Sequence, residues 1–142
     1  MMNNSKSLDR FLIAQEHSYE VALAEIRSGR KRSHWMWYIF PQVKGLGMSY
    51  TAKLYSIRDI DEAKAYISHP VLGPRLIEIS NALLELPGSD PTAVMGYPDD
   101  LKLRSSMTLF KQVSDDPVFQ AVLNKYYEGK DDLATLQILG LL

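Results

Sequence analysis

The chain has 142 residues, of which 46% are hydrophobic and 23% charged, a composition typical of one folded domain and not of a disordered segment. It has no cysteine, so disulfides, thiolate metal sites and cysteine nucleophiles are excluded, and a reducing compartment is expected. A formal net charge of -1 disfavours generic nucleic-acid binding. The sequence contains no signal-peptide pattern and no apolar run of about 18 residues, so we expect a cytoplasmic protein without membrane contact.

The first predicted helix covers residues 8–28, after a flexible N-terminal tail at 1–7. Its apolar side chains fall within one arc of the helical wheel, and Gly29 ends it. Gln15 lies in the middle of this apolar stripe, where a buried amide needs partners. We expect it either to pin a neighbouring loop by hydrogen bonds to the backbone or to line a ligand pocket.

An aromatic segment follows at residues 33–42. Ser33 is a possible N-cap of a short helix that Pro41 ends, and a buried strand is the competing assignment; we favour the helix. As a helix, the segment places His34, Trp37 and Tyr38 on one face, where an imidazole could act as acid or base and the rings could stack on a planar ligand. The alternative is a core helix whose polar tips bond to carbonyls.

The next turn contains Gly45 and Gly47, with Lys44 and Ser49 beside them. Glycine-rich turns before helices can present backbone N–H groups to an anion, so both glycines are candidate ligand contacts. The spacing matches neither the dinucleotide nor the nucleoside-triphosphate motif, and a plain turn is the alternative.

Each later helix is predicted from an Asp N-cap, a Pro in the first turn, or both. These helices are expected at 62–68 after Asp59 or Asp61, at 70–86, after Asp90-Pro91, from Asp99 or Asp100 to 113, after Asp116-Pro117, and at 133–139 after Asp131 or Asp132. About seven or eight short helices with short connections predict an all-α fold. We expect a compact, irregular orthogonal bundle that forms a single helical domain over residues 8–142.

The helix expected to end at 113 carries a dense polar run. Lys102, Arg104 and Ser105 belong to it, and two cations with several hydroxyls could bind a phosphate or carboxylate. Pairing of the cations with Asp99 and nearby acids is the alternative. Arg75, at the edge of another apolar stripe, is either a further ligand contact or an ordinary boundary residue.

Several of these segments together resemble one bacterial family, the domain of unknown function 1810. The matching pieces are Arg10-Phe11 with Ala14-Gln15, the segment 33–42, Gly45-Leu46-Gly47, His69-Pro70 with Leu72-Gly73 and Arg75-Leu76, and Asp100 with 102–110. The resemblance implies a small helical fold and no settled activity. Members are often described as calpastatin-like, but calpastatin's inhibitory regions are disordered repeats, whereas this chain has no repeat and 10% aromatic residues.

The leading hypothesis from the sequence is a domain that binds a nucleotide-like or phosphate-bearing small molecule, either as a ligand or as the substrate of an enzyme. If it is an enzyme, His34 is the candidate acid or base, and Arg104 with Lys102 stabilises an anion. The expected ligand contacts are Gln15, Trp35, Trp37, Gln42, Gly45, Gly47, Arg75, Lys102 and Ser105. No metal-ligand spacing occurs, so neither a metal nor a cofactor is expected.

Two alternatives use the same aromatic segment differently. In the first, residues 35–40 are an exposed patch that anchors a protein partner, because Trp, Tyr and Arg dominate binding hot spots. In the second, the segment serves folding alone. Exposure of the two tryptophans distinguishes these alternatives.

Overall fold

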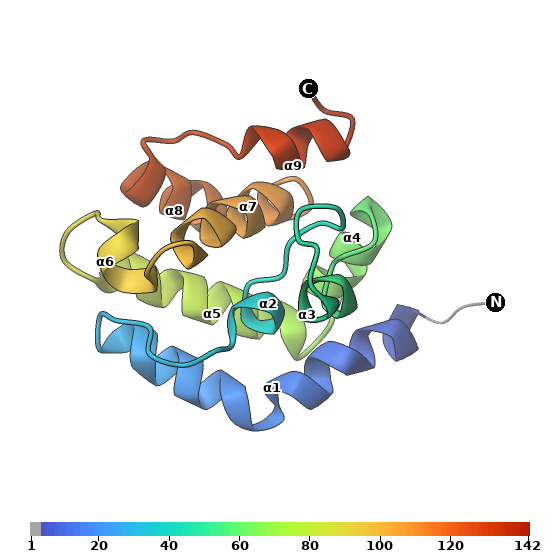
Figure 1. Ribbon diagram of the computed structural model, residues 1–142, viewed down its shortest axis with the longest axis horizontal. Helices are drawn as coiled ribbons and strands as arrows, with labels where there is room; N and C mark the ends of the chain where they lie inside the picture. The colour runs from blue at the N-terminus through green and yellow to red at the C-terminus, as the bar shows by residue number, and fades with distance from the viewer. Residues whose placement is uncertain (1–3) are drawn as a thin grey trace.

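The computed structural model describes residues 4–142, and in this range the chain folds into nine helices (Figure 1). They are α1 Asn4–Arg27, α2 Met36–Ile39, α3 Tyr50–Leu54, α4 Ile60–Ser68, α5 Leu72–Glu85, α6 Pro91–Met95, α7 Asp99–Lys111, α8 Val118–Tyr127 and α9 Leu133–Ile138. The predicted all-α fold is confirmed. Within the described range, no helix has the length and apolar character needed to cross a membrane.

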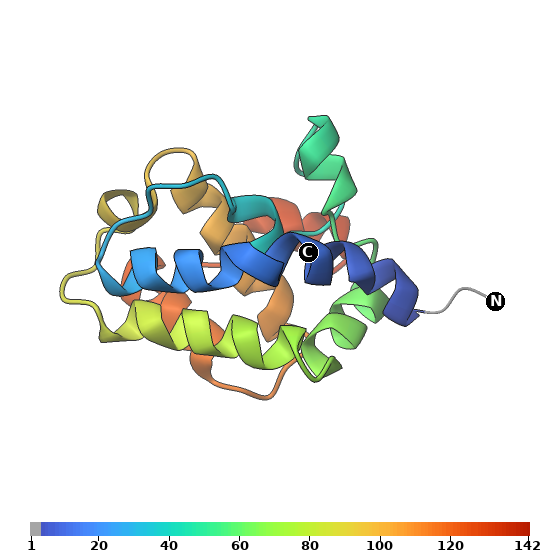
Figure 2. The same cartoon turned by 90° about the horizontal axis from the view of Figure 1, so that it is seen from below.

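The core is built around α7, which packs against α8, α6 and α9, while α1 and α5 run side by side (Figures 1 and 2). A chain of aromatic contacts crosses it. The Phe11 ring meets Tyr66 edge-on with centroids 5.1 Å apart, and Tyr66 lies 5.2 Å from Phe110. Phe110 lies 6.0 Å from Phe119, so one contact series joins α1, α4, α7 and α8.

Asp residues begin several helices, as the sequence predicts. The side chains of Asp59, Asp90 and Asp132 accept backbone N–H groups in the first turns of α4, α6 and α9. Asp116 accepts the Val118 amide in the same way, although α8 begins only after Pro117. The helix predicted from Asp99 or Asp100 is α7, which begins at Asp99.

Three predicted boundaries differ from the structure. Helix α1 begins at Asn4, so part of the expected tail is helical; residues 1–3 lie outside the described residues. Helix α2 begins at Met36, and Ser33 is not its cap, because the Ser33 hydroxyl donates to the Glu25 carboxylate instead. Helix α3 is missing from the prediction: it has five residues, and its cap Ser49 was assigned to the preceding turn.

The chain from Val43 to Ile57 forms an arm that carries α3 away from the rest of the molecule (Figure 2). An isolated parallel bridge between Val43 and Ile57 closes its base. The Ile57 amide donates to the Gln42 carbonyl, and the Lys44 amide donates to the Ile57 carbonyl, both at 2.8 Å. The base of the arm is therefore fixed to the segment that follows α2.

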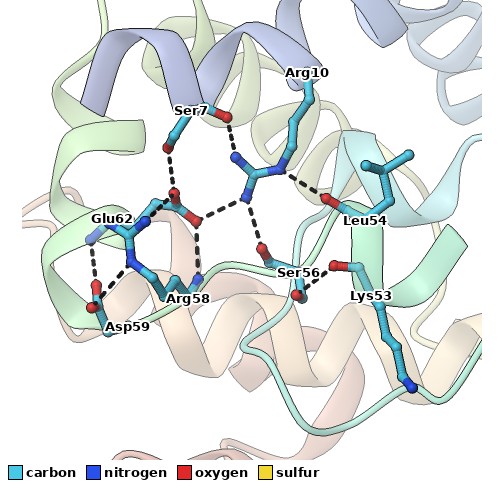
Figure 3. Close-up of polar contacts among 8 residues, drawn as sticks. All are labelled: Ser7, Arg10, Lys53, Leu54, Ser56, Arg58, Asp59 and Glu62. Carbon is cyan, nitrogen blue, oxygen red and sulfur yellow. Dashed lines mark hydrogen bonds and ion pairs between the residues drawn. The ribbon is translucent and has the colours of Figure 1, made fainter. Parts of the chain in front are cut away.

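Arg10 ties the returning end of the arm to α1 (Figure 3). Its guanidinium donates to the carbonyl oxygens of Leu54 and Ser56, both at 2.8 Å, and to the Glu62 carboxylate at 2.9 Å. Glu62 is buried and also accepts the Ser7 hydroxyl. Because these groups partner one another, we interpret the cluster as a structural support.

Candidate functional site

Two hollows open on the surface beside α2 and α7, and both are lined by Trp37 and Lys102. The Lys102 Nζ lies 4.7 Å from the centroid of the Trp37 ring. The His34 hollow, of about 340 Å3, is further lined by Lys31, His34, Tyr38, Ser49, Thr51 and Asp99. The Gln42 hollow, of about 300 Å3, is further lined by Gln42, Leu46, Leu101, Arg104, Ser105 and Asp132.

In the His34 hollow, one carboxylate lies between two ammonium groups. Asp99 accepts from Lys31 at 2.8 Å and from Lys102 at 2.9 Å. Burial by itself raises the pKa of Asp99, but hydrogen bonds from the two lysines outweigh it and hold the pKa below its ordinary value. Asp99 is therefore ionised at neutral pH. Its single negative charge balances one of the two lysine charges, so one positive charge remains.

His34 is exposed at the edge of this hollow. Its imidazole has no hydrogen bond to any residue in the described part of the chain, whereas its backbone carbonyl accepts the Tyr38 hydroxyl at 3.3 Å. The side chain is therefore free to meet a ligand. Its catalytic role stays a prediction.

Gln42 is the most unusual residue of the second hollow. Its side chain is 4% exposed, and its amide nitrogen Nε2 has no hydrogen-bond partner among the described residues. A buried polar group normally has a partner, and leaving one unmade costs about 1–3 kcal/mol. The structure thus leaves a buried, unpartnered donor in a side chain that lines the hollow.

Two polar residues next to Gln42 are already organised by the protein. Ser105 donates to Asp132 Oδ2 at 3.0 Å, and the same oxygen accepts the Thr135 amide at 3.1 Å. Asp132 is the N-cap of α9, so a helix start fixes its carboxylate at the hollow. The sequence predicts Asp132 as a candidate cap but contains no signal that it borders this site.

Arg104 lines the Gln42 hollow while holding the connection from α8 to α9. Its Nε donates to the Lys130 carbonyl at 3.0 Å, and one terminal nitrogen donates to the Asp131 carbonyl at 2.7 Å. Its partners are thus neutral backbone groups and not the acids expected in the pairing alternative. Its positive charge stays available to the hollow, although two of its donors are used.

Gln15 and Arg75 lie away from both hollows. The Gln15 amide donates to the Tyr38 carbonyl at 2.8 Å and to the Tyr66 hydroxyl at 3.0 Å, and Arg75 donates to the Gln15 oxygen at 3.3 Å. This is the pinning alternative: the buried amide joins α1 to α2 and α4. Of the two alternatives for Gln15, the structure supports pinning, and neither Gln15 nor Arg75 lines the His34 or the Gln42 hollow; their role as ligand contacts stays a prediction.

Trp35, a further expected ligand contact, lines neither hollow. It is 1% exposed and packs in the core, with ring centroids 6.1 Å from Phe40. Its indole N–H donates to Glu25 at 2.9 Å. Burial raises the pKa of Glu25, but hydrogen bonds from Ser33, the Arg32 amide and Trp35 outweigh it and lower the pKa to about 2. Trp35 thus supports the fold, and Trp37 is the tryptophan of the site.

The two glycines shape the wall of the site by leaving room for other atoms. A Cβ on Gly47 would lie 2.7 Å from the Trp37 ring and 2.5 Å from the Cβ of Ala52, so only glycine permits this approach. Gly45 has φ +109°, a backbone conformation that favours glycine. Both positions fit the plain-turn alternative, and the structure gives them no hydrogen bond that marks an anion site.

The sequence did not identify Lys31, Asp99 and Leu46 as site residues. In the sequence, Lys31 fits a cation that follows the first helix, Asp99 fits the start of a later helix, and Leu46 fits a turn between two glycines. Only the packing of α7 against the loops before and after α2 brings them together. Across residues 4–142, no group of three or more His, Asp or Glu side chains is arranged to hold a metal ion.

The fold and the two hollows define a small all-α domain with a divided polar site. The sequence matches the family described as "Protein of unknown function (DUF1810)" over residues 5–139, and the chain belongs to that family. The structure is similar to the crystal structure of the conserved hypothetical protein Rv1873 from Mycobacterium tuberculosis, at 46% sequence identity and a TM-score of 0.92, covering 95% of this chain and 97% of that chain. No functionally curated protein matches the sequence.

Proposed function

We propose that this protein binds a small phosphate-bearing molecule, nucleotide-like in character, across the His34 and Gln42 hollows. The observation that carries the proposal is the unpartnered amide of Gln42. A donor buried without a partner lowers stability, and a ligand oxygen or ring nitrogen in the hollow would supply the missing acceptor. Ligand binding would then offset the stability that the unpartnered amide costs the free protein.

The charges around the two hollows favour an anion. Three cationic side chains, Lys31, Lys102 and Arg104, line them against the two carboxylates of Asp99 and Asp132. The excess of one positive charge contrasts with the net charge of -1 of the whole chain. The site therefore attracts an anion locally although the molecule as a whole does not.

The size and wall chemistry suit a small planar molecule. Each hollow lies at the lower end of the range of roughly 300–1,000 Å3 common for ligand pockets. Trp37 offers a partly exposed aromatic ring between them, and stacking of a base on an aromatic side chain contributes about 1–3 kcal/mol. A cysteine-free chain agrees with a cytoplasmic location for this binding.

If the ligand is a substrate, His34 is the residue best placed to move a proton, since it lines a hollow and has no hydrogen-bonded partner among residues 4–142. Arg104 would then stabilise developing negative charge. The protein-partner alternative has less support, because only Trp37 and Tyr38 of residues 35–40 reach the surface.

A binding screen with matched variants tests the proposal. Thermal shifts and calorimetry are measured against nucleotides, sugar phosphates and dinucleotides for the wild type, Gln42→Met and the control Gln137→Met, an exposed glutamine on α9. A ligand at 100 times its dissociation constant adds about 2.7 kcal/mol, roughly 5 to 15 °C for this chain length.

The proposal expects one class of phosphate-bearing compound to shift the wild type and the control, and to shift Gln42→Met by less, because this variant lacks one hydrogen-bond donor. Gln42→Met must itself fold, which circular dichroism checks. A panel that leaves the wild type unshifted would overturn the proposal and direct attention to a protein partner.

A further inference from the structure

The two hollows differ in the groups that they offer to a ligand. Each is lined by two cationic side chains and one carboxylate: Lys31, Lys102 and Asp99 in the His34 hollow, and Lys102, Arg104 and Asp132 in the Gln42 hollow. The His34 hollow adds the exposed hydroxyls of Ser49 and Thr51, whereas the Gln42 hollow adds an amide, the buried Ser105 hydroxyl and the apolar side chains of Leu46 and Leu101. The hollows thus differ in the groups around the charges: exposed hydroxyl donors in one, and in the other the amide and apolar groups that recognise rings.

We infer that the hollows are two subsites for one nucleoside phosphate, with the phosphate in the His34 hollow and the nucleoside in the Gln42 hollow. The inference rests on the proposed function and adds an orientation and a ligand class to it. The ligand crosses from one subsite to the other beside Trp37 and Lys102, which line both.

The phosphate belongs in the His34 hollow because donors are still available there. An ammonium group has three N–H donors, and Lys102 gives one to Asp99, leaving others for phosphate oxygens. Lys102 is partly exposed, with 23% of its side chain accessible, so a ligand can reach its ammonium. The Thr51 side chain is exposed and supplies a further hydroxyl.

The Gln42 hollow is less suited to a phosphate, although Arg104 lines it. The guanidinium already donates from Nε and one terminal nitrogen to the carbonyls of Lys130 and Asp131, so this pair of donors cannot make a bidentate contact with a phosphate. The Asp132 carboxylate at the same wall has no ion pair among the described residues and would repel a dianion, whereas Asp99 in the His34 hollow is paired with two lysines. A neutral nucleoside meets neither obstacle.

The nucleoside has matching partners in this hollow. The unpartnered Gln42 Nε2 can donate to a ring nitrogen or a carbonyl of the base. Asp132 accepts from Ser105 and Thr135 through Oδ2, and its Oδ1 accepts no hydrogen bond from the described residues, so Oδ1 is available to a ribose hydroxyl. Leu46 and Leu101 provide apolar contacts to the ring.

The test compares each nucleoside 5′-monophosphate with its own nucleoside by calorimetry. The ratio of the two dissociation constants measures the gain from the phosphate and cancels the contribution of the base. The probes are the monophosphates and nucleosides of adenine, guanine, cytosine and uracil, with ribose 5-phosphate as a sugar phosphate without a base. The proteins are the wild type, Lys102→Met, Gln42→Met, and the control Lys64→Met, an exposed lysine on α4.

We expect Lys102→Met to reduce the gain from the phosphate by about 10-fold or more, since it removes a charge-assisted hydrogen bond. Gln42→Met should weaken nucleoside and monophosphate by the same factor and leave the ratio unchanged, and Lys64→Met should change neither constant. A ratio altered by Gln42→Met would reverse the orientation and overturn the inference, because Gln42 lines only the second hollow whereas Lys102 lines both.

The failures of the two proposals are distinguishable. Binding of ribose 5-phosphate with no gain from any base would overturn the nucleoside subsite and leave the proposed function intact. An absence of binding by every phosphate compound would remove both.

Discussion

The buried amide of Gln42 leads to a prediction about stability that does not depend on knowing the ligand. Its Nε2 has lost its water and gained no partner among the described residues. Replacement by Met keeps the unbranched shape and similar length of the side chain and removes the polar group. Gln42→Met should therefore make the free protein more stable, which is the opposite of the usual effect of a substitution at a buried position.

The magnitude follows from the cost of an unmade hydrogen bond, about 1–3 kcal/mol for a neutral group. Imperfect packing of the thioether offsets part of this gain, since volume-conserving changes cost up to about 1.5 kcal/mol. We expect the free energy of unfolding to rise by about 1 kcal/mol, which corresponds to roughly 3 to 5 °C in the melting temperature for a chain of this size.

Urea denaturation at 25 °C measures the effect, with Gln137→Met as the control for the substitution itself. The midpoint should increase for Gln42→Met with an unchanged slope, and the control should stay near the wild type. A loss of about 1 kcal/mol or more in Gln42→Met would show that the amide is satisfied in the free protein. That result would refute the reasoning on which the proposed site is based.

Three further predictions concern the framework of the site. Gly47→Ala should cost about 1–3 kcal/mol, because its Cβ would overlap the Trp37 ring, and the loss should appear in urea denaturation together with a changed Trp fluorescence. Arg10→Met should cost about 3 kcal/mol, because the buried Glu62 carboxylate loses its shorter ion pair and keeps only the one with Arg58, at 3.8 Å, and adding Glu62→Gln should recover part of the loss in a double-mutant cycle. The folded-state pKa of Glu25, about 2, lies below its ordinary value of 4.5, so the stability that Glu25 contributes is present above pH 4.5 and is lost as the pH falls toward 2. Glu25→Gln should flatten the pH dependence of stability in that interval, and an unchanged dependence would contradict the assigned hydrogen bonds.

The sequence predicts most of the helices because each has local signals. Apolar periodicity marks α1 and α5, and the N-caps Asp59, Asp90 and Asp132 mark α4, α6 and α9. Helix α3 escapes prediction because five residues give no measurable period and its side chains are mostly exposed. A cap residue such as Ser49 begins turns as readily as helices.

The site is only partly predictable for a different reason. Trp35 and Trp37 have the same chemistry and lie two positions apart, so composition cannot tell which one packs in the core; tertiary contacts place Trp35 there. Gln15 and Gln42 likewise look equivalent as polar residues next to apolar runs. One finds partners at Tyr38 and Tyr66, and the other does not. Pairing of a buried amide depends on what packs against it, which no single sequence segment specifies.

The closed base of the arm has a consequence for how the family can diversify. The Val43–Ile57 bridge and the Arg10 contacts hold both ends of the arm in place, so the exposed residues of the arm can change without shifting α2 or α4, whereas Gly47 cannot, because it packs against Trp37 of α2. Because Ser49 and Thr51 of the arm line the His34 hollow, such changes act directly on the chemistry presented to a ligand. The exposed part of the arm can thus vary while the framework that carries it, Gly47 included, stays the same.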